Sequence, residues 1–246
     1  SPISSRDGKL AILHTKLHGA AGYVHASDQL PSTIHPFSNQ LSVIYLSDLH
    51  QQPGNPGYMA TLTHELQHLV HLKADPSEEA WINEGLSELA TDIAGYPSPL
   101  KHSRRFSAST PLTLWGHFND SASQYLSSSL FFNYLYHHYV RPMGLQQLLN
   151  VEADGILGIN HYLHQQGYPE EFSGIFGDWI VASFLGHRGI GKYTYPEAPL
   201  SLFIENQINQ SEIFSGSNFP FSSTFVRIVP TDEHSVIEFQ GEEFVP

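Results

Sequence analysis

The sequence predicts an α+β protein in which a few strands come first, several helices follow and a short β segment ends the chain. Residues 40–47 (QLSVIYLS) are rich in β-branched and aromatic residues and form the clearest strand. Residues 58–73 instead repeat apolar side chains at spacings of three and four, as a helix does. After about residue 200 the composition turns to Asn, Ser, Gln and Gly. Strands and helices therefore occupy separate parts of the chain.

The first part of the chain is expected to be β-rich. Residues 10–18 and 22–25 are predicted to be short extended segments. The strand at 40–47 ends in a loop at 52–57 that contains two prolines and two glycines. A helix at 58–73 follows, with its apolar repeat made by Met59, Leu62, Leu66, Leu69 and Val70, and Asp75-Pro76 ends it.

A second helix is expected to begin at Ser77 as N-cap and to run to about Ala94. The remaining predicted segments are a Ser/Thr/Pro-rich loop at 97–121, helices at 122–139, 144–151, 155–166 and 169–186, and strands at 222–229 and 236–239. We therefore expect one domain over residues 1–200, β-rich over about 1–73 and helical over about 77–200, with a β-containing extension over 201–246.

Composition narrows the classes of partner and metal site. The 246 residues carry 11 Lys+Arg against 24 Asp+Glu, a formal charge of −13, which argues against nucleic acid or an anionic membrane as the partner. The absence of cysteine excludes thiolate ligands, so any metal must be held by His and carboxylates. It also suits a secreted or extracellular bacterial protein. Residues 1–7 do not resemble a signal peptide, and such a segment could have been removed before this chain begins.

One short motif carries metal chemistry. Residues 64–68 (HELQH) form the pattern HExxH. On a helix, His64 and His68 lie one turn apart on the same face, so both imidazoles can reach one cation, and Glu65 lies beside them. The alternative is a surface helix whose histidines face solvent. A catalytic zinc ion needs a third protein ligand and one open position, so the sequence must supply another donor.

The second predicted helix offers that donor. It contains residues 81–88 (WINEGLSE), in which Glu84 and Glu88 are again four residues apart. Glu84 is the candidate third ligand, and Glu88 is the candidate acceptor for the other N–H of a ligating histidine. An exposed acidic helix face is the alternative for both.

HELQH followed by WINEGLSE resembles the gluzincin zinc peptidases, which include thermolysin and the zinc aminopeptidases, and is most similar to the hyicolysin-type bacterial neutral metallopeptidases. The resemblance is specific over residues 57–95, looser over 22–186 and weak beyond 200. It implies a zincin (thermolysin-like) fold, a Zn²⁺ ion held by His64, His68 and Glu84, and Glu88 as a carboxylate outside the ligand set. Only 15 residues separate His68 from Glu84, fewer than in thermolysin-like enzymes and typical zinc aminopeptidases. The metzincin pattern fails, because His71 and Ala74 stand where it requires Gly and His.

The resemblance also implies a mechanism. Glu65 takes a proton from a zinc-activated water that attacks the scissile carbonyl, and passes it to the leaving amine. A second donor must stabilise the oxyanion, and Tyr125 is the candidate because it opens an apolar helix. Tyr125 is one of 12 tyrosines and packing is its alternative role; the rival donors are His117, Tyr134 and His102.

The sequence does not define the roles of three further residues near these motifs. His71 lies three residues past His68, and its angle around the helix suggests a side chain that faces solvent. Trp115 and Phe118 precede Tyr125, where either a substrate pocket or the core would explain them.

Zinc-dependent hydrolysis of a peptide or protein substrate by an endopeptidase is the leading hypothesis. An aminopeptidase ranks second, since it needs acidic groups for the substrate amine and no Gly-rich exopeptidase motif precedes the helix. A non-catalytic zincin-fold binding module is the third hypothesis, and Glu65 argues against it, because a structural metal site needs no base. The sequence leaves the oligomeric state open.

Overall fold

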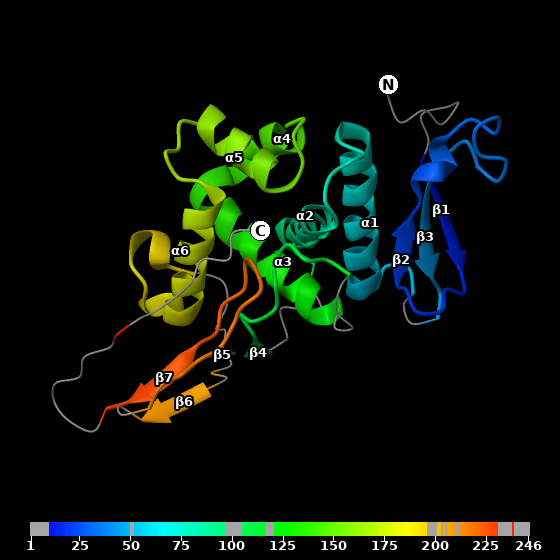
Figure 1. Ribbon diagram of the computed structural model, residues 1–246. Helices are drawn as coiled ribbons and strands as arrows, with labels where there is room; N and C mark the ends of the chain where they lie inside the picture. Colours follow the sequence, from blue (N-terminus) through cyan, green and yellow to red (C-terminus); the bar gives the residue numbers. More distant parts are fainter. Residues whose placement is uncertain are drawn as a thin grey trace.

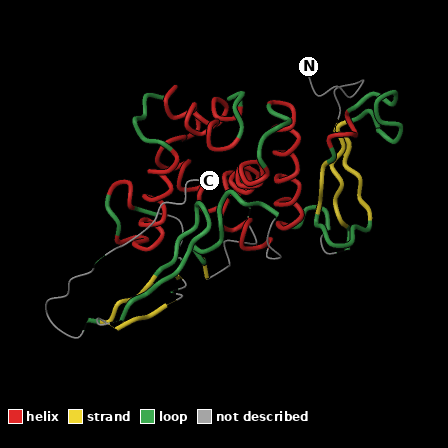
Figure 2. Tube along the Cα trace, viewed as in Figure 1, coloured by secondary structure: helices red, strands yellow, loops and turns green. Residues whose placement is uncertain are grey.

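A computed structural model describes residues 10–49, 52–96, 105–116, 121–195, 201–202, 204, 206–209, 212–230 and 238. The described chain is α+β, as predicted. Figure 1 shows a small sheet on one side of helix α1 and the other helices on its opposite side. The same division into a strand region and a helical region is clear in Figure 2.

The N-terminal sheet has three strands in the order β1-β3-β2. Their bounds are β1 Leu10–Thr15, β2 Gly22–Val24 and β3 Ser42–Ser47, with a 3₁₀ helix, η1, at Ala26–Gln29. β1 runs parallel to the central strand β3, and β2 runs antiparallel to it. The predicted strand at 40–47 is thus confirmed with a slightly later start. β2 lies at one edge of this sheet, next to α1.

Helix α1 (Pro56–Ala74) joins the sheet to the rest of the molecule. Its start is well capped, because the Asn55 side chain accepts a hydrogen bond from the Gly57 N–H and proline fills the first helical position. A small core of Ile44, Leu46, Tyr58 and Leu69 attaches it to the sheet. Leu66 and Val70 of the predicted apolar repeat are 43% and 45% exposed. The helix therefore presents polar residues to its neighbours at several inward positions.

Helix α2 (Ala80–Ile93) begins after a five-residue link. The prediction that Ser77 caps it is wrong, since Glu79 occupies the N-cap position without a side-chain cap bond. The Ser77 hydroxyl instead donates to Asp75, and it also lies 3.2 Å from a carboxylate oxygen of Asp154. The Asp75 side chain bonds to Ser77 in a local turn and so competes with helix capping.

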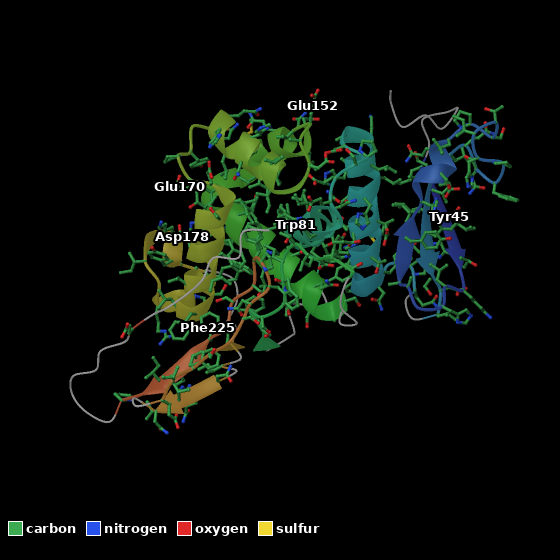
Figure 3. All side chains as sticks on the ribbon, in the orientation of Figure 1. Tyr45, Trp81, Glu152, Glu170, Asp178 and Phe225 are labelled. Carbon is green, nitrogen blue, oxygen red and sulfur yellow. The ribbon has the colours of Figure 1, made fainter. Side chains whose placement is uncertain are left out.

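The remaining helices form a mainly apolar body. Their bounds are α3 Ser121–Leu135, a π-helical turn η3 at Tyr136–Val140, α4 Arg141–Leu149, α5 Gly155–Gln165, α6 Phe172–Leu185, and short 3₁₀ turns η4 Gly186–Arg188 and η5 Gly191–Tyr193. Trp81 of α2 is 1% exposed and packs on Phe131, Phe132 and Phe172 with ring centroids 5.6–6.1 Å apart. Figure 3 shows Trp81 inside this body. No helix in the described ranges is both long and apolar enough to cross a membrane.

Residues after 200 return to the helical body and then extend from it. β4 (Arg105–Phe106) pairs with β5 (Ser201–Leu202), and β6 (Asn206–Asn209) pairs with β7 (Val226–Val229), both in parallel. Phe221 packs on Phe172 at 4.8 Å, and its carbonyl accepts a hydrogen bond from the Leu112 N–H. In Figure 1 the β6–β7 pair projects away from the helices. The predicted strand at 222–229 is shortened to β7, and the one at 236–239 lies outside the described residues apart from Glu238, which is not in a strand.

Candidate metal centre

Three donor atoms from α1 and α2 converge beside the sheet. The Nε2 atoms of His64 and His68 are 3.0 Å apart, and the Oε2 atom of Glu84 lies 3.0 Å from the first and 3.4 Å from the second. Among the described residues, these three form the one group of His, Cys, Asp or Glu side chains close enough to hold a metal ion together. Two imidazole nitrogens and one carboxylate oxygen are a donor set typical of catalytic zinc.

The opposite nitrogen of each histidine also has a partner. Nδ1 of His64 lies 3.2 Å from Oε1 of Glu88. Nδ1 of His68 lies 2.9 Å from Oδ1 of Asn83 and 3.0 Å from the Ser87 hydroxyl. Acceptors at these positions fix a histidine with its proton on Nδ1 and leave Nε2 free to bind a metal.

The charges around the histidines favour a cation. Burial alone would lower the pKa of His64, but the carboxylates of Glu84 and Glu88 raise it to about 10. Burial likewise opposes ionisation of Glu84, yet the two histidines lower its pKa to about 2. Because a metal must displace the proton from His64, its binding releases protons and weakens as the pH falls.

Glu65 points into the same region from α1. Its side chain is 5% exposed, and burial raises its pKa above the ordinary value despite the nearby histidines. It lines the same two cavities as His64. A carboxylate with a raised pKa beside a candidate metal site is suited to accepting a proton from water near neutral pH.

Strand β2 closes over Glu65 through a glycine. A Cβ added to Gly22 would lie 2.9 Å from Cγ2 of Thr61 and 3.0 Å from Cγ of Glu65, closer than side chains pack. The absence of a side chain at Gly22 therefore lets the edge strand approach the helix.

A cleft extends from this point in two directions. One cavity of about 430 Å³ runs toward Ala20 and Ala60, and another of about 350 Å³ runs toward Val24 and Leu72. Gly22, His64, Glu65 and Tyr125 line both cavities. The candidate centre thus lies where the two halves of the cleft meet.

Tyr125, at the start of α3, reaches the centre from the helical body. Its side chain lies near the carboxylate of Glu84, and burial together with the charge of Glu84 raises its pKa above the ordinary value. Trp115 packs on the Tyr125 ring at 5.0 Å and against the main core. Gln124 holds the preceding loop, because its amide donates to the Leu114 carbonyl at 2.7 Å.

Of the other candidates for the oxyanion donor, only Tyr134 lies in the described part of the chain, and it is not at the centre. Tyr134 is fully buried in the helical body, and its hydroxyl donates to the Lys192 carbonyl. His102, His117 and Phe118 lie outside the described residues.

The expectation for His71 is wrong. Its side chain is only 2% exposed, and its Nδ1 atom lies 3.2 Å from Oδ1 of Asn83. Positions i, i+4 and i+7 of a helix lie along one stripe, so His64, His68 and His71 face the same neighbour, α2. The spacing of seven between His64 and His71 was the signal that could have placed it.

Sequence reasoning also missed the roles of Asn83, Ser87 and Gly22. Asn83 and Ser87 are four residues apart on α2, on the face where they meet His68, and this i, i+4 spacing was a usable signal. No sequence pattern could have identified Gly22, because its role depends on how closely β2 approaches α1.

No family model matches the chain, and no curated protein is significantly similar to it. Similarity to known proteins therefore assigns no family here.

Proposed function

We propose that this protein is a zinc-dependent peptidase of the zincin type, most consistent with an exported endopeptidase. The observation that carries the proposal is the convergence of His64, His68 and Glu84 with Glu65 beside them at the middle of a cleft. The resemblance of residues 57–95 to gluzincins agrees with it.

The donor set fits zinc. His64, His68 and Glu84 would hold the ion, and Glu88, Asn83 and Ser87 would orient the two imidazoles. When bound, zinc supplies a Lewis acid that lowers the pKa of a coordinated water from 15.7 to about 7 and polarises a carbonyl.

The chain's own residues would then move the protons. Glu65 accepts a proton from the attacking water and delivers it to the leaving amine. Tyr125 presents its hydroxyl beside Glu84, where it can donate to the developing oxyanion. Burial of both side chains strengthens these interactions, because surrounding water would otherwise screen them.

The shape of the cleft favours an endopeptidase. Because cavities continue from His64 and Glu65 in both directions, a substrate chain can extend past the scissile bond at either end. The edge strand β2 borders both cavities, and an extended peptide can add to such an edge through its main chain. An aminopeptidase would need one end of the cleft closed around the substrate amine.

The first experiment compares the wild type with Glu65→Gln. Zinc content is measured by mass spectrometry, and cleavage is measured with a mixture of quenched fluorescent peptides. We expect about one zinc ion in each protein, and cleavage reduced by ~10²–10⁴-fold in the variant. Glu171→Gln, at an exposed position far along the chain, is the matched control and should cleave like the wild type.

The same assay separates the alternatives. A wild type without zinc, or a Glu65→Gln variant with full activity, would refute the proposal, and zinc without cleavage would favour a binding module. Peptides blocked by acetylation and amidation distinguish the two peptidases. An endopeptidase cleaves them, whereas an aminopeptidase requires the free amine.

A further inference from the structure

His71 is a buried polar residue that the proposed chemistry does not use. It lies on α1 three residues past His68 and is 2% exposed. Its Nδ1 atom lies 3.2 Å from Oδ1 of Asn83. A histidine buried this deeply keeps a hydrogen-bond partner, so this contact defines its orientation.

The same amide oxygen serves a candidate metal ligand. Oδ1 of Asn83 also lies 2.9 Å from Nδ1 of His68, so one oxygen faces two imidazole nitrogens. An amide oxygen accepts hydrogen bonds at two lone pairs, and both contacts are satisfied only when each ring carries its proton on Nδ1. If the amide turned over, its NH₂ group would require both nitrogens to be bare. Asn83 therefore couples the tautomers of the two histidines.

Only one of these arrangements suits a metal. Nε2 of His68 faces His64 and Glu84, so it must be unprotonated to act as a ligand. The arrangement with the Asn83 oxygen turned toward the rings provides this. The Ser87 hydroxyl, 3.0 Å from Nδ1 of His68 and 2.5 Å from Oε1 of Gln67, donates to Gln67 and can accept from His68. It supports the same tautomer independently.

We infer that His71 is a positioning residue for the proposed zinc centre. By donating from Nδ1 to Asn83, it holds the amide oxygen toward His68 and keeps the Nε2 atom of His68 free for the metal. The inference rests on the proposed function for the presence and the identity of the ion. The coupling of the two rings through Asn83 is a property of the protein without metal as well.

The test combines zinc affinity with direct observation of the tautomers. In His71→Phe the donor to Asn83 is lost, and we expect zinc affinity, measured by chelator competition, to fall about tenfold, near the lower end of the ~10–100-fold range for partners of metal ligands, because Ser87 remains. In His71→Asn the side-chain NH₂ lies near the former Nδ1 position, so affinity should return to within about threefold of the wild type. Long-range ¹H–¹⁵N spectra should show Nδ1–H on both His68 and His71.

A matched variant controls for loosening of the helix. Leu69→Ala removes a side chain that is 1% exposed on the same helix but packs toward the sheet. It should lower the melting temperature more than it lowers zinc affinity. Equal loss of affinity in Leu69→Ala and His71→Phe would overturn the inference, as would unchanged affinity in His71→Phe.

The spectra test the coupling of His68 and His71 through Asn83 even if the protein is not a peptidase. Metal-free wild type with Nδ1–H on both rings supports it, and an Nε2–H proton on His71 overturns it. A wild type that binds no zinc refutes the peptidase proposal by itself, whereas a zinc-binding wild type with an indifferent His71→Phe variant refutes only the role of His71.

Discussion

The phenol ring of Tyr125 faces the imidazole of His64, with ring centroids 6.2 Å apart. Tyr125 comes from α3, whereas His64 comes from α1 and its carboxylate partners come from α2. Three helices thus meet at the candidate centre. Tyr125 of α3 and Gly22 of strand β2 both line the two cavities at this centre.

This position makes Tyr125→Phe informative. Removing the hydroxyl should lower kcat about 10²-fold, as loss of an oxyanion donor does, while KM and zinc content change little. Steady-state kinetics on one peptide together with metal analysis would measure this. Tyr162→Phe, in the core and bonded to the Tyr139 carbonyl, is the control that should keep full kcat. A Tyr125→Phe variant with unaltered kcat would assign the oxyanion contact elsewhere.

Gly22→Ala tests the close approach of β2 to Glu65. The new methyl group would lie 2.9–3.0 Å from carbon atoms of Thr61, Glu65 and Leu46, which is closer than van der Waals contact. Either the strand or the glutamate must therefore shift. We expect a loss of ~1–3 kcal/mol in unfolding free energy and a fall in kcat, because the proton acceptor is displaced. Zinc content should stay near one, since the three atoms nearest to the methyl belong to Thr61, Glu65 and Leu46 and not to a ligand. If a stable Gly22→Ala protein keeps the wild-type kcat, the close approach of β2 at Gly22 is not needed to place Glu65.

Gly85→Ala tests the packing of α2 on α3. A Cβ at Gly85 would collide with the ring of Phe132, which is itself fully buried. The unfolding free energy should drop by ~1–3 kcal/mol or more, although alanine is the better helix former. Adding Phe132→Leu should restore part of it, because leucine vacates the ring position. Gly174→Ala, on α6 with open space around it, should be neutral or stabilising in the same denaturant titration.

Glu78 gives a pH-dependent prediction away from the centre. Burial raises its pKa to about 7, although the N–H groups of Gly155 and Glu79 donate to it. A carboxyl whose pKa is higher in the folded state stabilises the fold below its unfolded pKa, and that contribution is lost as the pH rises toward 7. Glu78→Gln should therefore melt higher than the wild type at pH 8 but not at pH 4.

Melting curves of the metal-free proteins across this range would measure the difference. The exposed Glu152 provides the control, because Glu152→Gln should shift the melting temperature equally at both pH values. A constant difference between Glu78→Gln and the wild type would show that folding leaves the pKa of Glu78 unchanged.

The strands and helices near the candidate centre were largely predictable from local patterns. The loop at 52–57 and the capping Asn55 fix the start of α1, and HExxH spacing places His64 and His68 on one face. The third donor was also accessible, because Glu84 and Glu88 repeat the spacing of four on the next helix.

The sequence pattern gave a wrong prediction of which side chains of α1 are buried. The apolar repeat indicated a helix correctly, but Leu66 and Val70 are largely exposed while Glu65 and His71 are buried. Hydrophobic periodicity assumes that buried positions are apolar, and a helix that carries a polar site between two packed layers breaks this rule. Tertiary contacts such as Gly22 against Glu65 leave no local pattern at all.

The short link between α1 and α2 has a consequence for the denatured chain. His64 and Glu84 are only 20 positions apart in sequence, so bringing them together in an unfolded chain costs less loop-closure entropy than joining more distant ligands would. The proposed zinc ion would therefore also bind the unfolded ensemble, and would stabilise the native protein by less than its native affinity alone gives. Both ligand-bearing helices lie within residues 56–93, so the proposed ion would link only local elements and could bind before the distant strands and helices have packed.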